Sequence, residues 1–144
     1  MQLSVPLRLL FAAALLIGGD AVATEKYAIA SDAKCVVVGR LVNAQQTRTP
    51  GGWDIAGEVL VQEVLFGEVE RGSRMHYHFR CSCCIRSGAP YLDSTLRIVG
   101  VWFLLPEPQN RWTSAGSCSD PGWRPMGDRQ SFVDFFKKRQ EKKP

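Results

Sequence analysis

Three of the chain's five cysteines fall within four positions, in the sequence Cys81-Ser82-Cys83-Cys84. The cluster follows an alternating run, 73–81, which is typical of a β-strand with one buried face. One side of this predicted strand is apolar and carries Met75, Tyr77, Phe79 and Cys81, while the other carries His76, His78 and Arg80. Cysteines packed this densely indicate disulfides, a metal site or a redox pair, and the compartment of the protein helps to choose among these.

The first 23 residues have the pattern of a secretory signal peptide. Arg8 supplies a basic start, residues 9–17 are apolar, and Ala21-Val22-Ala23 provides the small residues that signal peptidase requires. The apolar stretch would span only about 14 Å as a helix, against a hydrocarbon core of roughly 30 Å. We therefore expect cleavage after Ala23 and a soluble mature chain that is secreted or periplasmic, with no stable membrane anchor.

All five cysteines lie in this predicted mature chain, in a compartment where disulfides form and persist. Because five is an odd number, at least one thiol stays outside the internal bonds. Cys118 is the expected partner of Cys83 or Cys84, and Cys35 could bond Cys81 if their strands are neighbours. The sequence leaves the connectivity open.

A metal site is the alternative role for the cluster. His76 and His78 are two positions apart, so both imidazoles lie on one strand face, about 6.5–7 Å apart. Together with Cys81, Cys83 and Cys84 they could bind zinc or copper. Disulfides are favoured because an oxidising compartment consumes free thiolates. A C-x-x-C redox pair is disfavoured, because no helix pattern follows the cluster to lower a thiol pKa.

No catalytic constellation is evident in the sequence. The motifs G-x-S-x-G and H-E-x-x-H and a phosphate-binding glycine loop are all missing. We therefore expect a protein that is not an enzyme and that carries no cofactor. We expect the tryptophans to fill the core, Trp102 above all, although three others could line a binding surface: Trp53, Trp112 and Trp123.

Charge is distributed unevenly along the chain. Residues 24–128 carry eleven basic and eleven acidic side chains, so the whole net charge of +4 lies in residues 129–144. A neutral body has no electrostatic footprint for nucleic acid, which is therefore not an expected partner. We expect the basic tail to be solvated.

The pattern of apolar residues and turn formers predicts five short strands, at 34–43, 53–66, 73–81, 94–105 and 111–115. Apolar residues on both faces of 98–105 indicate a covered strand, which Pro106 should end. A loop is expected at 119–125. Ser131 should begin a helix with Asp134 as its capping partner, and a phenylalanine stripe should pack on the body: Phe132, Phe135 and Phe136.

These elements predict an all-β fold: a small five-stranded Greek-key OB-like barrel at 24–128, followed by a C-terminal amphipathic helix and basic tail at 129–144. Two segments, 35–42 (CVVVGRLV) and 59–67 (VLVQEVLFG), resemble the netrin-like group of OB-folds, which includes the tissue inhibitors of metalloproteinases. The resemblance covers 34–118 and implies cysteines that tie loops to the barrel. Those inhibitors grip zinc with an N-terminal cysteine, whereas Cys35 lies eleven residues after Thr24, so no functional residue is carried over.

The sequence thus predicts a secreted or periplasmic, disulfide-stabilised and non-enzymatic binding module for a protein or glycan partner that it does not identify. The alternative is a zinc- or copper-binding protein that uses the histidine pair and the cysteine cluster.

Overall fold

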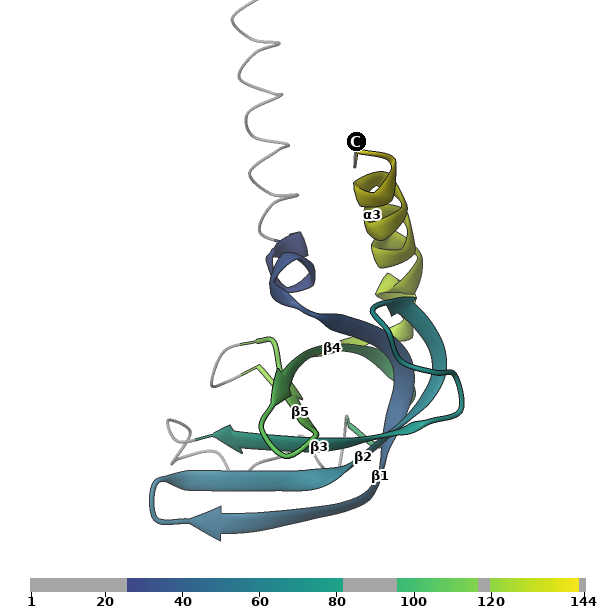
Figure 1. Cartoon of the computed structure of the whole chain (residues 1–144). Helices are drawn as coiled ribbons and strands as arrows, with labels where there is room; N and C mark the ends of the chain where they lie inside the picture. Colours follow the sequence, from purple (N-terminus) through teal and green to yellow (C-terminus); the bar gives the residue numbers. More distant parts are fainter. Residues whose placement is uncertain (1–25, 82–95, 117–119, 143–144) are drawn as a thin grey trace, which may run out of the picture.

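The computed structural model describes residues 26–81, 96–116 and 120–142. More than half of these residues lie in strands, so the chain is mostly β-sheet (Figure 1). The strands are β1 (Cys35–Thr49), β2 (Gly52–Phe66), β3 (Arg74–Cys81), β4 (Gly100–Glu107), β5 (Arg111–Ser114) and β6 (Trp123–Pro125). A short helix at 26–32 precedes β1, and the 3-10 turn η1 (Met126–Asp128) leads into the C-terminal helix α3 (Arg129–Glu141). The coarse prediction, a β-rich body with a C-terminal helix, is confirmed.

Five of these strands pair in a closed ring. The order is β1, β2, β3, β5 and β4, and β4 pairs back onto β1. The contact between β3 and β5 is parallel, through Tyr77 and Trp112, whereas the other pairings are antiparallel. The short strand β6 adds to the edge of β4 that β1 leaves free.

The hairpin of β1 and β2 extends beyond the part of β1 that closes the ring by pairing with β4. β1 pairs with β4 only from Cys35 to Gly39, so beyond this point β2 is its only strand partner among the described residues. Figure 1 shows the far half of the hairpin extending beyond β4 and β5, with β3 running alongside β2. The strand was expected to end at Asn43, but an irregularity between Val42 and Gln45 lets it continue to Thr49. Asn43 takes a φ of 51° there.

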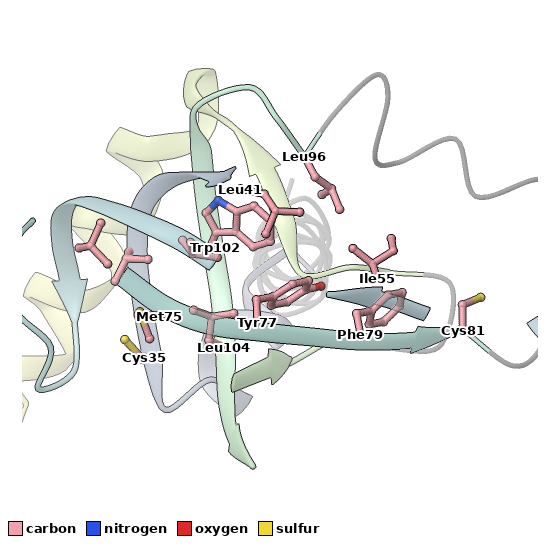
Figure 2. Packing of buried hydrophobic residues seen from close by; sticks show 13 residues of the cluster. Cys35, Leu41, Ile55, Met75, Tyr77, Phe79, Cys81, Leu96, Trp102 and Leu104 are labelled. Carbon is pink, nitrogen blue, oxygen red and sulfur yellow. The ribbon is translucent and has the colours of Figure 1, made fainter. Parts of the chain in front are cut away.

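The ring encloses a first group of buried side chains, here called the inner core. Its members come from all the long strands and include Val37, Ile55, Val59, Tyr77, Phe79, Trp102 and Leu104 (Figure 2). Trp102 is fully buried, and its Nε1 donates a hydrogen bond to the carbonyl oxygen of Gly39 at 3.0 Å. Its ring meets that of Tyr77 edge-on at 5.1 Å. Burying each such side chain contributes about 1.5–3 kcal/mol to folding.

A second group, the outer core, lies on the other face of β1 and β4 and beneath the two helices. Its strand members alternate with those of the inner core, and Phe132 and Phe136 of α3 cover them. Tyr27 of the 26–32 helix stacks on Phe135 at 4.9 Å, which joins the two helices. The predicted packing of the phenylalanine stripe is confirmed. The two cores also explain why β1 and β4 begin with residues that are apolar on both faces.

The structure corrects several predicted boundaries. β4 begins at Gly100 rather than at 94, and part of the expected loop forms β6. Trp123 of β6 lies against Gly100, where the Cβ of any larger residue would lie only 2.1 Å from the indole Nε1, so this position needs glycine. Pro106 lies inside β4 instead of ending it. Among the described residues β4 pairs there with β5 alone, which leaves one edge of the strand without a ladder partner, so the missing N–H of proline costs little.

The start of α3 also differs from the prediction. The helix begins at Arg129 and its N-cap, Asp128, makes no side-chain capping bond. Ser131 lies inside the helix, where its hydroxyl accepts a hydrogen bond from Lys26 at 3.2 Å. Asp134 instead accepts a bond from Gln130 at 3.1 Å. The capping box is therefore absent, because the helix begins at Arg129 and places Ser131 inside it rather than at the N-cap.

The predicted signal peptide and its cleavage site lie outside the described residues. Within the three described ranges, no helix combines the length and the apolar character needed to cross a bilayer.

Candidate functional site

The outer face of β3 collects polar side chains from several strands. β3 pairs with β2, and on the outer face this pairing places His78 opposite Ala56 and His76 opposite Glu58. His76 is exposed and His78 is partly exposed, which confirms the prediction that both point away from the inner core. The alternation of β3 thus places its polar side chains on one face of the sheet and its apolar side chains on the other.

An open pocket of about 330 Å³ lies on this face. Four strands of the ring contribute to it: Asn43 and Gln45 from β1; Ala56, Gly57 and Glu58 from β2; His76, Tyr77 and His78 from β3; and Arg111 from β5. Its volume is at the small end of the range that ligand pockets occupy. Because its walls are paired strands, the pocket is built on a rigid frame.

His78 lies between two carboxylates. Its Nε2 is 3.9 Å from Oδ2 of Asp54 on β2, and its Nδ1 is 3.9 Å from Oε2 of Glu107 on β4. Both distances are too long for direct hydrogen bonds, so the imidazole keeps its donor and acceptor capacity. Asp54 is bound more closely by Arg80, whose Nε donates to it at 3.0 Å, and this bond raises the pKa of Arg80.

The other charged groups of the pocket differ in their partners. Glu58 accepts a hydrogen bond from Nδ2 of Asn43 at 3.2 Å and lies 3.9 Å from Arg74. Arg111 has no hydrogen-bond or ion-pair partner among the described residues, and its buried Nε is unpaired. The pocket therefore contains one positive charge that nothing in the described part of the protein satisfies.

The cysteines are arranged differently from the expected pairing. Cys35 is a free thiol, fully buried, and burial raises its pKa to about 11. It lies opposite Leu104, whereas Cys81 lies opposite Trp53 near the tip of the β1–β2 hairpin. The bond between Cys35 and Cys81 depended on their strands being neighbours, and this condition is not met, because β2 lies between β1 and β3. Cys83, Cys84 and Cys118 lie outside the described residues.

The structure brings together only part of the predicted metal set. Cys81 points into the inner core with 4% of its surface exposed, on the opposite side of β3 from His76 and His78. In the described ranges, no group of three or more His, Cys, Asp or Glu side chains is placed to hold a metal ion. With Cys83 and Cys84 outside those ranges, the metal hypothesis stays a prediction.

Several pocket residues were not identified from the sequence. Arg111 was noted only as the start of a short strand, and Asn43 and Gln45 lie at or beyond the predicted end of the first strand. No local pattern signals them, because the pocket depends on which strands become neighbours. The one available signal was the face shared by the two histidines.

A comparison of the chain with protein-family models, with curated proteins and with solved structures finds no match. The candidate site therefore stands on its own geometry.

Proposed function

We propose that the protein is an exported, disulfide-stabilised binding module built on an OB-like Greek-key barrel, and that it is not an enzyme. The ring order of the strands, closed by β1 with β4 and by a parallel β3–β5 contact, supports the barrel assignment. OB-folds are five-stranded, partly open Greek-key barrels that bind oligonucleotides or oligosaccharides on the face of their second and third strands.

One observation carries the binding proposal: the pocket lies on the outer face of β2 and β3. This is the face that OB-like barrels use for ligands, and here it carries histidine, arginine, glutamate and amide side chains. A few polar groups on a rigid surface provide orientation and specificity for a bound molecule. The proposed partner is a protein or glycan, since the chain body carries no net charge that would attract nucleic acid.

A blocked pocket tests this proposal. Ala56 is exposed and lies opposite His78, so Ala56→Arg would project a long side chain into the pocket. Gln62→Arg adds the same side chain at an exposed β2 position that does not line the pocket. We expect glycans or proteins that bind the wild-type chain in array experiments to lose at least about tenfold in affinity with Ala56→Arg only. Equal binding by both variants would contradict the proposed site.

The disulfide part of the proposal rests on the free thiol of Cys35. With Cys35 buried in the inner core, four cysteines remain, which is the even number that two bonds require. We expect thiol labelling of the exported protein to find one thiol, at Cys35, and only after unfolding. Five labelled thiols would remove the structural role of the cysteines, and a mass-spectrometric bond to Cys35 would contradict its assignment as the one free thiol.

A further inference from the structure

Arg111 is the pocket's unexplained charge. It begins β5, opposite Glu107 in the β4–β5 hairpin, and its side chain is partly buried against the pocket. A buried donor without a partner gives up its hydration and gains no bond in return, and this loss is larger for a charged group than for a neutral one. The other guanidinium nitrogens of Arg111 also have no partner among the described residues, and a ligand in the pocket can supply one.

Four of the described arginines have carboxylate partners in the structure. Arg80 binds Asp54, Arg124 binds Asp120 at 2.8 Å, and Arg129 binds Glu63. Arg74 lies 3.9 Å from Glu58. Arg111 differs from all four because it faces a pocket and has no such partner in the described chain.

We propose that the pocket binds a carboxylate group of its ligand, with Arg111 as the principal contact. This inference rests on the proposed binding function and names the chemistry of the ligand at that same site. Guanidinium presents a planar fork of donors that matches the two oxygens of a carboxylate, and such bidentate bonds are about twice as strong as neutral ones.

The surroundings of Arg111 favour a singly charged group over a doubly charged one. Glu58 lines the same pocket and Glu107 lies across the hairpin, so a phosphate dianion would meet two negative charges. The remaining contacts are uncharged or weakly charged groups that can donate or accept hydrogen bonds: Asn43, Gln45, His76 and His78. The volume, about 330 Å³, suits one small acidic unit such as a sugar acid.

Matched small probes test the inference on the full mature protein. Acetate, acetamide and inorganic phosphate are titrated at constant ionic strength while NMR follows the Nε–Hε signal of Arg111 and the amides of 76–78. Acetamide has the shape of acetate without its charge. We expect saturable shifts with acetate, and affinities at least about tenfold weaker for acetamide and for phosphate.

Variants locate the effect. Arg111→Gln should abolish the saturable acetate shifts at 76–78, and Arg111→Lys, which keeps the charge but loses the fork, should weaken them severalfold. Arg97→Gln, at an exposed arginine outside the pocket, is the matched control and should bind acetate as the wild type does. Circular dichroism and thermal unfolding show that each variant is folded. The Nε–Hε signal of Arg111 in the wild-type protein tests the contact directly, even if a variant fails to fold.

Each contrary result has a distinct meaning. Equal binding of acetate and acetamide, tighter binding of phosphate, or acetate binding that survives Arg111→Gln, would overturn the carboxylate assignment. Shifts that never saturate and that spread over exposed basic residues would show adventitious ion contact only, and would overturn it too. A neutral glycan whose binding is sensitive to Ala56→Arg, in a protein that ignores acetate, would overturn this inference and leave the binding function standing.

Discussion

On the inner face of β3, Met75, Tyr77 and Phe79 are at most 4% exposed, whereas on the outer face His76 is exposed and His78 keeps 23% of its side chain exposed. The inner residues share one apolar environment with every long strand of the ring. The outer residues instead lie near separate polar groups of β2 and β4, and Arg111 of β5 lines the same pocket. One strand thus packs the core on one side and lines the pocket on the other, and we expect that the two sides can be changed independently.

The largest expected effect separates the two faces at adjacent positions. Phe79→Ala opens a cavity in the inner core and should lower the free energy of unfolding by about 3–5 kcal/mol. His78→Ala removes a partly exposed side chain without a direct hydrogen bond and should change it by no more than about 0.5 kcal/mol. Urea denaturation of both variants measures the difference. Similar losses at the two positions would show that β3 does not have one packing face and one recognition face.

A smaller effect is expected where the inner face carries a polar atom. The hydroxyl of Tyr77 donates to the carbonyl oxygen of Pro121 at 2.9 Å, and burial raises the pKa of Tyr77 well above its ordinary value, with the charges of Asp120 and Glu107 adding to the effect. Tyr77→Phe removes this bond and leaves a buried acceptor, which should cost about 1–2 kcal/mol.

Tyr27→Phe is the control for this change, because no hydrogen bond of its hydroxyl is present in the described residues. It should alter the free energy of unfolding by less than about 0.5 kcal/mol. If the two variants lose equal stability in chemical denaturation, the Tyr77 bond contributes nothing specific.

The smallest effect concerns the ion pair of Asp120 and Arg124, whose exposure is intermediate between that of the inner and outer residues of β3. Burial alone would raise the pKa of Asp120, but hydrogen bonds from Arg124 and from the backbone N–H of Gly122, together with the charge of Arg124, leave it below its ordinary value. A lowered folded-state pKa stabilises the protein above the unfolded pKa of about 3.9, and this stabilisation is lost as the pH falls through the folded pKa.

Asp120→Asn should therefore lower the free energy of unfolding by about 1 kcal/mol at pH 7 and should flatten its dependence on pH below roughly pH 4. Glu68→Gln, at an exposed turn position, is the control and should change neither quantity beyond about 0.5 kcal/mol. Thermal unfolding from pH 2 to 7 provides the measurement. An unchanged acid profile in Asp120→Asn would show that the pair does not stabilise the fold.

The period-2 pattern of β3 predicted its length, its buried face and the direction of its histidines almost without error. The pattern was reliable there because a strand with one covered face must alternate. It failed at the end of β1, where an irregularity at Asn43 and Ala44 interrupts the pairing without ending the strand. The capping motif at Ser131 was also misleading, since the helix begins two residues earlier and the serine hydroxyl accepts a hydrogen bond from Lys26 instead.

The candidate site was only half predictable. His76 and His78 could be assigned to one face from their spacing, since two positions along a strand return to the same side. Arg111 could not be joined to them, because the parallel contact of β3 with β5 involves a single pair, Tyr77 and Trp112, and leaves no local pattern. The sequence likewise left open whether Cys35 and Cys81 lie on neighbouring strands, and in the ring β2 separates them.

By itself the amino-acid sequence determined the location of the five ring strands though not all their ends, the buried face of β3 and the phenylalanine stripe of α3, because these follow from backbone geometry and from the removal of apolar surface from water. Only the tertiary structure decided that Asp54 and Glu107 flank His78, that Arg111 lines the same pocket as the histidines, and that Cys35 remains a buried thiol. Those outcomes depend on which strands become neighbours, and neighbours are selected by the packing of the whole ring rather than by any one segment.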